Sequence, residues 1–151
     1  MTTETTPAAG SPKGPENKSF ARYLPTVARL LMGLVFFVFG LNGFFNFIPP
    51  PKTPMSEAAM GFIGGLMKTG YMFPMIAGTQ VLVGALLLTN LFVPLALALI
   101  APVIVNIVAF HLFLERSGTP IAIVVALLEL YLAWSYREAF CSMLRPKTRP
   151  S

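Results

Sequence analysis

Long apolar runs separated by short polar turns make up most of the chain after residue 25. Four of these runs have close to the 20 or so residues that an α-helix needs to cross the hydrocarbon core of a bilayer. They predict transmembrane helices at about 26–48, 72–90, 93–114 and 120–140. We therefore predict an all-α, polytopic membrane protein.

Turns and prolines indicate how these runs connect. Short turns around Asn90 and Gly118 make successive runs antiparallel neighbours. Glycine and alanine recur at helical spacing within the runs, which lets neighbouring helices approach closely. We predict an antiparallel four-transmembrane-helix bundle. Each run has a proline near its first turn, where the missing N–H would have no partner in any case: Pro25, Pro74, Pro94 and Pro120.

The first loop contains a segment that is apolar but cannot span a bilayer. Residues 55–67 are too few, and Ser56, Glu57 and three glycines interrupt their apolar character. Such a segment favours a short helix at the membrane interface, which would cover one end of the bundle as a lid. Pro102 lies inside the third run and is expected to kink it, because it cannot donate to the preceding turn.

Composition agrees with a chain that is surrounded by lipid. The 151 residues are 55% hydrophobic and 11% charged, whereas soluble domains contain about 25% charged residues. The net charge of +5 does not indicate nucleic-acid binding, because basic residues flank the apolar runs instead of alternating with aromatic ones. We predict a disordered cytoplasmic tail at 1–25, a membrane domain at 26–140 and a basic tail at 141–151.

Lysine and arginine are distributed unevenly between the two sides of the predicted bundle. Loops on the cytoplasmic side of a membrane carry the excess of these residues. We therefore predict a multi-pass protein of the inner (cytoplasmic) membrane with both termini in the cytoplasm. Eight of the eleven basic residues lie on the side of the termini: Lys13, Lys18, Arg22, Arg29, Arg137, Arg145, Lys147 and Arg149.

Glu129 is the most informative single residue, because it lies within the fourth apolar run. A carboxylate at the bilayer centre costs about 3 kcal/mol, so it is expected to face protein or water and to have a function. A helical rise of about 1.5 Å per residue places it near the midplane, slightly toward the outer side. A purely structural role is the alternative.

Polar side chains in the other three runs lie in the outer half by the same measure. We predict that they converge with Glu129 on a ligand pocket, since such pockets combine apolar walls with a few polar groups. Amides in membrane helices also bind neighbouring helices, at about 0.6 kcal/mol per hydrogen bond. His111 aligns with Glu115 one turn on, which is an alternative to ligand binding. With Glu129, the candidate pocket residues are Asn42, Gln80, Asn106 and His111, while Asn46 is a further polar residue in the outer part of the first run.

The sequence argues against metal and thiol chemistry. One histidine and scattered carboxylates do not make a metal site. Cys141 is the single cysteine, so neither a disulfide nor a C-x-x-C pair can form within the chain. No motif of an independent enzyme is present, and we predict no cofactor within the chain.

Three stretches of the chain resemble the DoxX family of small four-span membrane proteins. They are ARLLMGLVFFVFGLNGFFNFI, GTQVLVGALLLTNLFVPLALALIAPVIVNIVAFHLF and ALLELYLAWSYREAF, which lie within residues 26–140. Members of the family place a glutamate where this chain has Gln80, so the resemblance does not extend to a pair of carboxylates. The family's DoxX-like branch carries polar residues at the positions of Asn42, Asn106, His111 and Glu129.

The resemblance implies an association with membrane redox proteins and does not imply a particular reaction. The family takes its name from a subunit of a thiosulfate:quinone oxidoreductase, which implies a quinone or lipid as ligand and a membrane redox protein or a second copy as partner. We predict an accessory or binding subunit whose pocket holds a quinone-like or other amphiphilic molecule. The alternatives are a component of a membrane oxidoreductase and a small proton-linked transporter in which Glu129 carries the proton.

Overall fold

The computed structural model describes residues 22–49 and 54–143, and every regular element in these ranges is a helix. Four helices are long and apolar enough to cross a membrane, as the sequence predicts. The predicted tails at 1–25 and 141–151 lie mostly outside the described residues. The four membrane-length helices are α2 (Leu24–Phe45), α4 (Met72–Thr89), α5 (Val93–Phe113) and α6 (Thr119–Ser135), the last preceded by the 3₁₀ turn η1 (Arg116–Gly118).

Two helix ends differ from the sequence prediction. The first helix ends at Phe45 and not at 48, because Asn46 takes a left-handed conformation with φ 49°. The run predicted at 120–140 is divided: α6 ends at Ser135, and the short helix α7 (Arg137–Met143) follows. At this break the N–H of Tyr136 bonds back to α6, and the guanidinium of Arg137 lies 5.4 Å from the ring centre of Trp134.

Helices α2 and α4 form the most extensive contact in the fold. A Cβ added at Gly40 would lie 2.7 Å from the backbone nitrogen of Val81, and one added at Gly84 would lie 2.7 Å from the Cα of Phe37. Only glycine permits backbones to approach so closely. The contacts run in opposite order along the two helices, since Gly33 meets Leu87, whereas Gly40 meets Val81.

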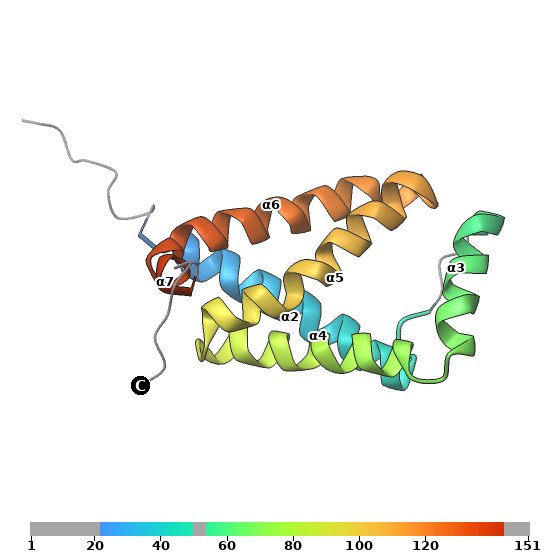
Figure 1. Ribbon diagram of the computed structural model, residues 1–151, viewed down its shortest axis with the longest axis horizontal. Coiled ribbons are helices and arrows are strands. Elements are labelled where there is room, and N and C mark those ends of the chain that lie inside the picture. The colour runs from blue at the N-terminus through green and yellow to red at the C-terminus, as the bar shows by residue number, and fades with distance from the viewer. Residues whose placement is uncertain (1–21, 50–53, 144–151) are drawn as a thin grey trace, which may run out of the picture.

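The well-packed core fills only one half of the molecule. Its eleven buried apolar residues come from the start of α2, the end of α4, the first part of α5 and the end of α6. We call this part, which contains the α4–α5 turn at Asn90, the core half. The opposite part, with α3 (Glu57–Lys68) and the α5–α6 turn, is the cavity half. Figure 1 shows the core half on the left and the cavity half on the right.

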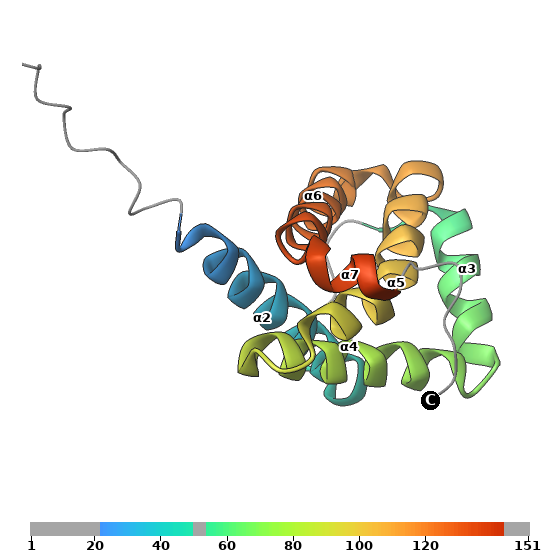
Figure 2. The ribbon, with the colours of Figure 1, turned by 60° about the vertical axis from the view of Figure 1, so that its left-hand side comes forward.

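The outer surfaces of the four long helices are apolar. Large side chains are exposed on each of them, for example Leu34 on α2, Leu82 on α4 and Val105, which is 68% exposed, on α5. Soluble proteins seldom expose apolar surface of this extent, whereas lipid tails cover it without cost. In Figure 2 the α5–α6 pair and the α2–α4 pair are both visible, with α3 beside α4 and α5.

Candidate functional site

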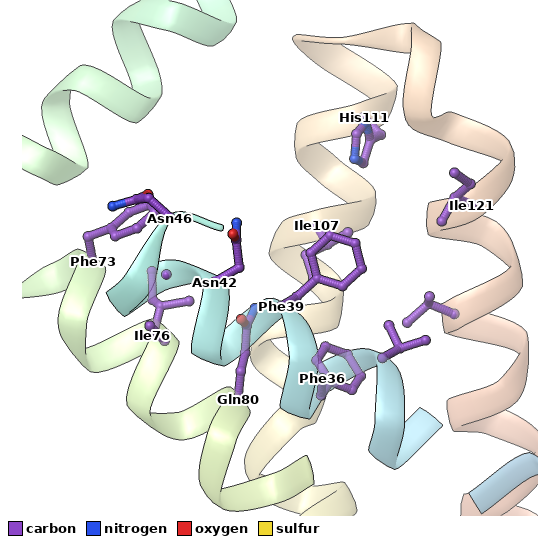
Figure 3. Close-up of a pocket in the computed structure, with 14 residues that line it drawn as sticks. Phe36, Phe39, Asn42, Asn46, Phe73, Ile76, Gln80, Ile107, His111 and Ile121 are labelled. Carbon is purple, nitrogen blue, oxygen red and sulfur yellow. The ribbon is translucent and has the colours of Figure 1, made fainter. Parts of the chain in front are cut away.

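Two apolar cavities lie in the cavity half, and four of the five predicted site residues line them. The first, cavity A, measures about 370 Å³ and lies between α2, α4, α5 and α6. Its walls are mainly aliphatic and aromatic. Figure 3 shows Asn42, Gln80 and His111 reaching it from three different helices. Its main apolar side chains are Val35, Phe36, Phe39, Phe73, Ile76, Ile107, Ile121 and Val125.

The second cavity, cavity B, measures about 360 Å³ and lies between α3, α4 and α5. Phe62 and Leu66 of α3 line one side of it, and Phe62 meets Phe110 of α5 with ring centres 5.7 Å apart. Asn106 lines this cavity and not cavity A. The two cavities share one wall, made of Phe73, Ile76, Gln80, Ile107 and His111.

Asn42 is held by the chain reversal that ends α2. Its Oδ1 accepts the backbone N–H of Ile48 at 2.7 Å, and its own carbonyl accepts the N–H of Asn46. The left-handed turn at Asn46 makes this possible, and asparagine tolerates that conformation better than most residues. The amide oxygen of Asn42 is therefore occupied, and its NH₂ group has no hydrogen bond to the described residues.

His111 is fixed near the end of α5 by the turn that follows. Its Nδ1 lies 3.0 Å from the main-chain oxygen of Glu115, and its own carbonyl accepts a hydrogen bond from the Thr119 hydroxyl at 2.9 Å. The imidazole packs against Gly118, where any Cβ would overlap the ring. His111 thus contacts Glu115 as its spacing predicts, but through the backbone and not through the carboxylate.

The Glu115 carboxylate instead ties the lid to the bundle. It accepts the N–H of Ser56 and the hydroxyl of Ser117, both at 2.9 Å. The Ser56 hydroxyl donates to the carbonyl of Leu114 and also accepts the N–H of Ala59, so it caps α3. The hydrogen bonds from Ser56 and Ser117 lower the pKa of Glu115 below its usual value of 4.5.

Gln80 lies near the middle of α4 and borders both cavities. Its amide makes no hydrogen bond to the described part of the chain, so both its oxygen and its NH₂ group remain available. The same holds for Asn106, which is exposed on the open side of cavity B. These free amides give the apolar cavities their polar groups.

Glu129 is buried but lies outside both cavities, contrary to the expectation that it would join the other polar groups. Its side chain is 8% exposed, and its Oε2 has no hydrogen-bond partner among the described residues. Because α6 ends at Ser135, Glu129 lies past the middle of the helix toward the core half. Val125, one turn earlier in α6, does line cavity A.

Arg29 is a second buried charged residue, and the sequence prediction used it only to orient the helices in the membrane. It is 7% exposed, and its guanidinium donates a hydrogen bond to the carbonyl of Leu87 near the end of α4. A cation at a helix C-terminus is favourably placed, because that end of the helix dipole is negative. Its position more than one turn inside an apolar run was the signal that could have indicated burial.

The fold and the cavities define a class: an all-helical protein with four membrane-length helices and two apolar cavities that carry a few polar groups. Comparison with protein-family models, with curated proteins and with solved structures gave no match. The resemblance to the DoxX family therefore stays a prediction from the sequence. Within the described residues no three acidic, histidine or cysteine side chains are grouped to hold a metal ion.

Proposed function

We propose that this chain is an integral membrane protein whose four long helices cross the inner membrane as an antiparallel bundle. The exposed apolar side chains on each of these helices support this arrangement. The core half faces the cytoplasm, because Arg22 and Arg137 lie beside that end of the bundle. The cavity half then lies in the outer half of the bilayer, with α3 at its surface.

The native cysteine provides a direct test of this orientation. Cys141 is exposed in α7, so a membrane-impermeant maleimide should label it only after the cells are permeabilised. A cysteine at Ser117, in a Cys141→Ser background, should react in intact cells, since Ser117 lies in the exposed turn before α6. Labelling of Cys141 in intact cells would reverse the orientation.

The proposed activity is the binding of an uncharged, quinone-like amphiphile in cavity A, as an accessory or binding subunit for a membrane redox partner. This proposed activity rests on one observation. Asn42, Gln80 and His111, from three helices, border one apolar cavity. A molecule from the bilayer would place its polar head among these groups and its ring or tail against the apolar walls.

The shared wall between the cavities suggests a route for such a ligand. Cavity B is lined by α3, α4 and α5, and residues of α4 and α5 border both cavities. Side-chain rotations occur on the picosecond to nanosecond scale where they are not tightly packed. A lipid-soluble molecule can therefore enter sideways beneath α3 while its tail remains in cavity B.

Equilibrium binding of 2-decyl-1,4-benzoquinone to the protein in lipid nanodiscs tests the activity. We expect saturable binding at one site per chain, weakened about threefold to tenfold in Gln80→Leu through the loss of one hydrogen bond. Thr79→Val is the matched control, because Thr79 is adjacent but lines neither cavity. Non-saturable uptake that equals that of empty nanodiscs would reject the proposal.

A further inference from the structure

The hydrogen bonds around cavity A assign a fixed donor and a fixed acceptor to its polar groups. The Asn42 oxygen is already taken by the N–H of Ile48 at 2.7 Å. An amide has one oxygen and two N–H donors, so Asn42 presents mainly donors to the cavity. This orientation is set by the backbone of residues 46–48 and does not depend on a ligand.

His111 has the opposite polarity. The main-chain oxygen of Glu115, 3.0 Å from Nδ1, can only accept a hydrogen bond, so Nδ1 must carry the proton. In the neutral imidazole Nε2 is then an acceptor. No described residue donates to Nε2, and the close fit of the ring against Gly118 keeps it in this position.

The apolar walls of cavity A add a preference for a ring. Phe36, Phe39 and Phe73 come from two helices and all border the cavity. Contacts between aromatic rings are favourable beyond the burial of their surface. Gln80 can act as donor or acceptor, so it does not select between head groups.

We propose that cavity A prefers a phenolic head group, as in a reduced hydroquinone, over a head that can only accept hydrogen bonds. A phenol hydroxyl can donate to Nε2 of His111, whereas a carbonyl or ether oxygen leaves Nε2 unpaired. This inference rests on the proposed function, since it names the chemical class of ligand for the same cavity.

A matched pair of probes that do not undergo redox cycling tests the preference. The probes are 4-decylphenol and 4-decylanisole, which differ only in the methyl group that removes the donor. Binding is measured in nanodiscs at pH 8, and uptake by empty nanodiscs corrects for partition into lipid. We expect the wild type to bind the phenol about threefold to tenfold more tightly, the effect of one net hydrogen bond.

Three variants separate the contributions of His111 and Asn42 to the binding of the two probes. His111→Phe should remove the preference while retaining binding of the anisole, because only the acceptor is lost. Asn42→Leu should leave the ratio of the two affinities unchanged, because it removes a donor and both probes carry an oxygen that accepts. Thr79→Val should leave the affinity for both probes unchanged, because Thr79 lines neither cavity.

The outcomes distinguish this inference from the proposed function. Equal affinity for the two probes in the wild type overturns the preference but leaves the binding function in place. A preference that persists in folded His111→Phe overturns the role of His111. If neither probe binds saturably, and the quinone does not either, the proposed function fails together with the inference.

Discussion

The core half and the cavity half are built from the same four apolar helices but are packed in different ways. In the core half Met32, Leu87 and Ile100 are almost completely buried. In the cavity half two cavities of about 370 and 360 Å³ remain between the same helices. Protein interiors are usually packed without such spaces, because an empty volume loses contacts that would stabilise the fold.

Arg29 of the core half differs in its hydrogen bonding from two amides of the cavity half. Arg29 in the core half is buried and bonded to a helix end. The amides of Gln80 and Asn106, which line the cavity half, make no hydrogen bond to the described residues. The densely packed apolar core therefore lies in one half of the molecule, while the other half retains hydrogen-bonding capacity that suits a ligand.

Breaking the α2–α4 contact should have the largest effect on stability. Gly84→Leu places a side chain where even a Cβ would lie 2.7 Å from the backbone Cα of Phe37, so the helices must separate. We expect the free energy of unfolding to fall by about 3 kcal/mol, the upper end for overpacked cores. Circular dichroism during thermal unfolding in detergent measures the change.

A glycine outside this contact provides the control. Gly61 in α3 has no atoms within 4 Å of an added Cβ, so Gly61→Ala should be neutral or slightly stabilising. If Gly84→Leu melted at the same temperature as Gly61→Ala, the close approach of α2 and α4 would not hold in the protein.

Replacing Glu129 should have the next largest effect, and of opposite sign. Its buried Oε2 has no partner among the described residues, and an unpaired buried polar group costs about 1–3 kcal/mol. Glu129→Leu should therefore raise the free energy of unfolding by a similar amount. Glu129→Gln keeps the size and an unpaired polar group, so we expect a change below about 1 kcal/mol.

The same pair of variants decides whether Glu129 has a function that depends on its carboxyl. A residue retained at a cost in stability is expected to serve activity. If Glu129→Leu were more stable and yet abolished the cellular phenotype, the carboxyl would serve function. A loss of stability in Glu129→Leu would show that the carboxyl has a partner and is structural.

The sequence predicts the helices well, because apolar length and composition alone decide whether a segment can span a bilayer. All four membrane-length helices and the short α3 lie where the pattern indicates, within a few residues. The exception is the break at Tyr136, after which Arg137 and Glu138 begin the short helix α7. Hydropathy does not detect a change in chain direction of that kind.

The candidate site could be predicted only in part. Depth along each helix correctly grouped Asn42, Gln80 and His111 at one end, and all three line cavity A. Depth alone does not fix the rotation of each helix about its axis, so it could not assign Asn106 to cavity B or place Glu129 outside both cavities. The partners of Glu115 were also hidden, because Ser56 is far away in sequence.

The smallest predicted effect concerns the contact that joins the lid to the cavity half. Glu115 accepts hydrogen bonds from Ser56 and Ser117, which lower its pKa below 4.5. A depressed pKa in the folded state means that the contact stabilises the fold at neutral pH and is lost as the pH falls through that lowered value. The lid should therefore remain attached down to about pH 4.5 and loosen only below it.

The amide proton of Ser56 reports this titration directly, because it donates to the carboxylate. Its chemical shift in NMR spectra should be constant from neutral pH to 4.5 and change with a midpoint below that value. In Glu115→Gln the shift should not titrate, while Ser56→Ala should retain the titration and lose both the cap of α3, worth about 1 kcal/mol, and the hydrogen bond to the Leu114 carbonyl. A midpoint above 4.5 in the wild type would show that Glu115 does not bind Ser56, and that the cavity half is open at its α3 side.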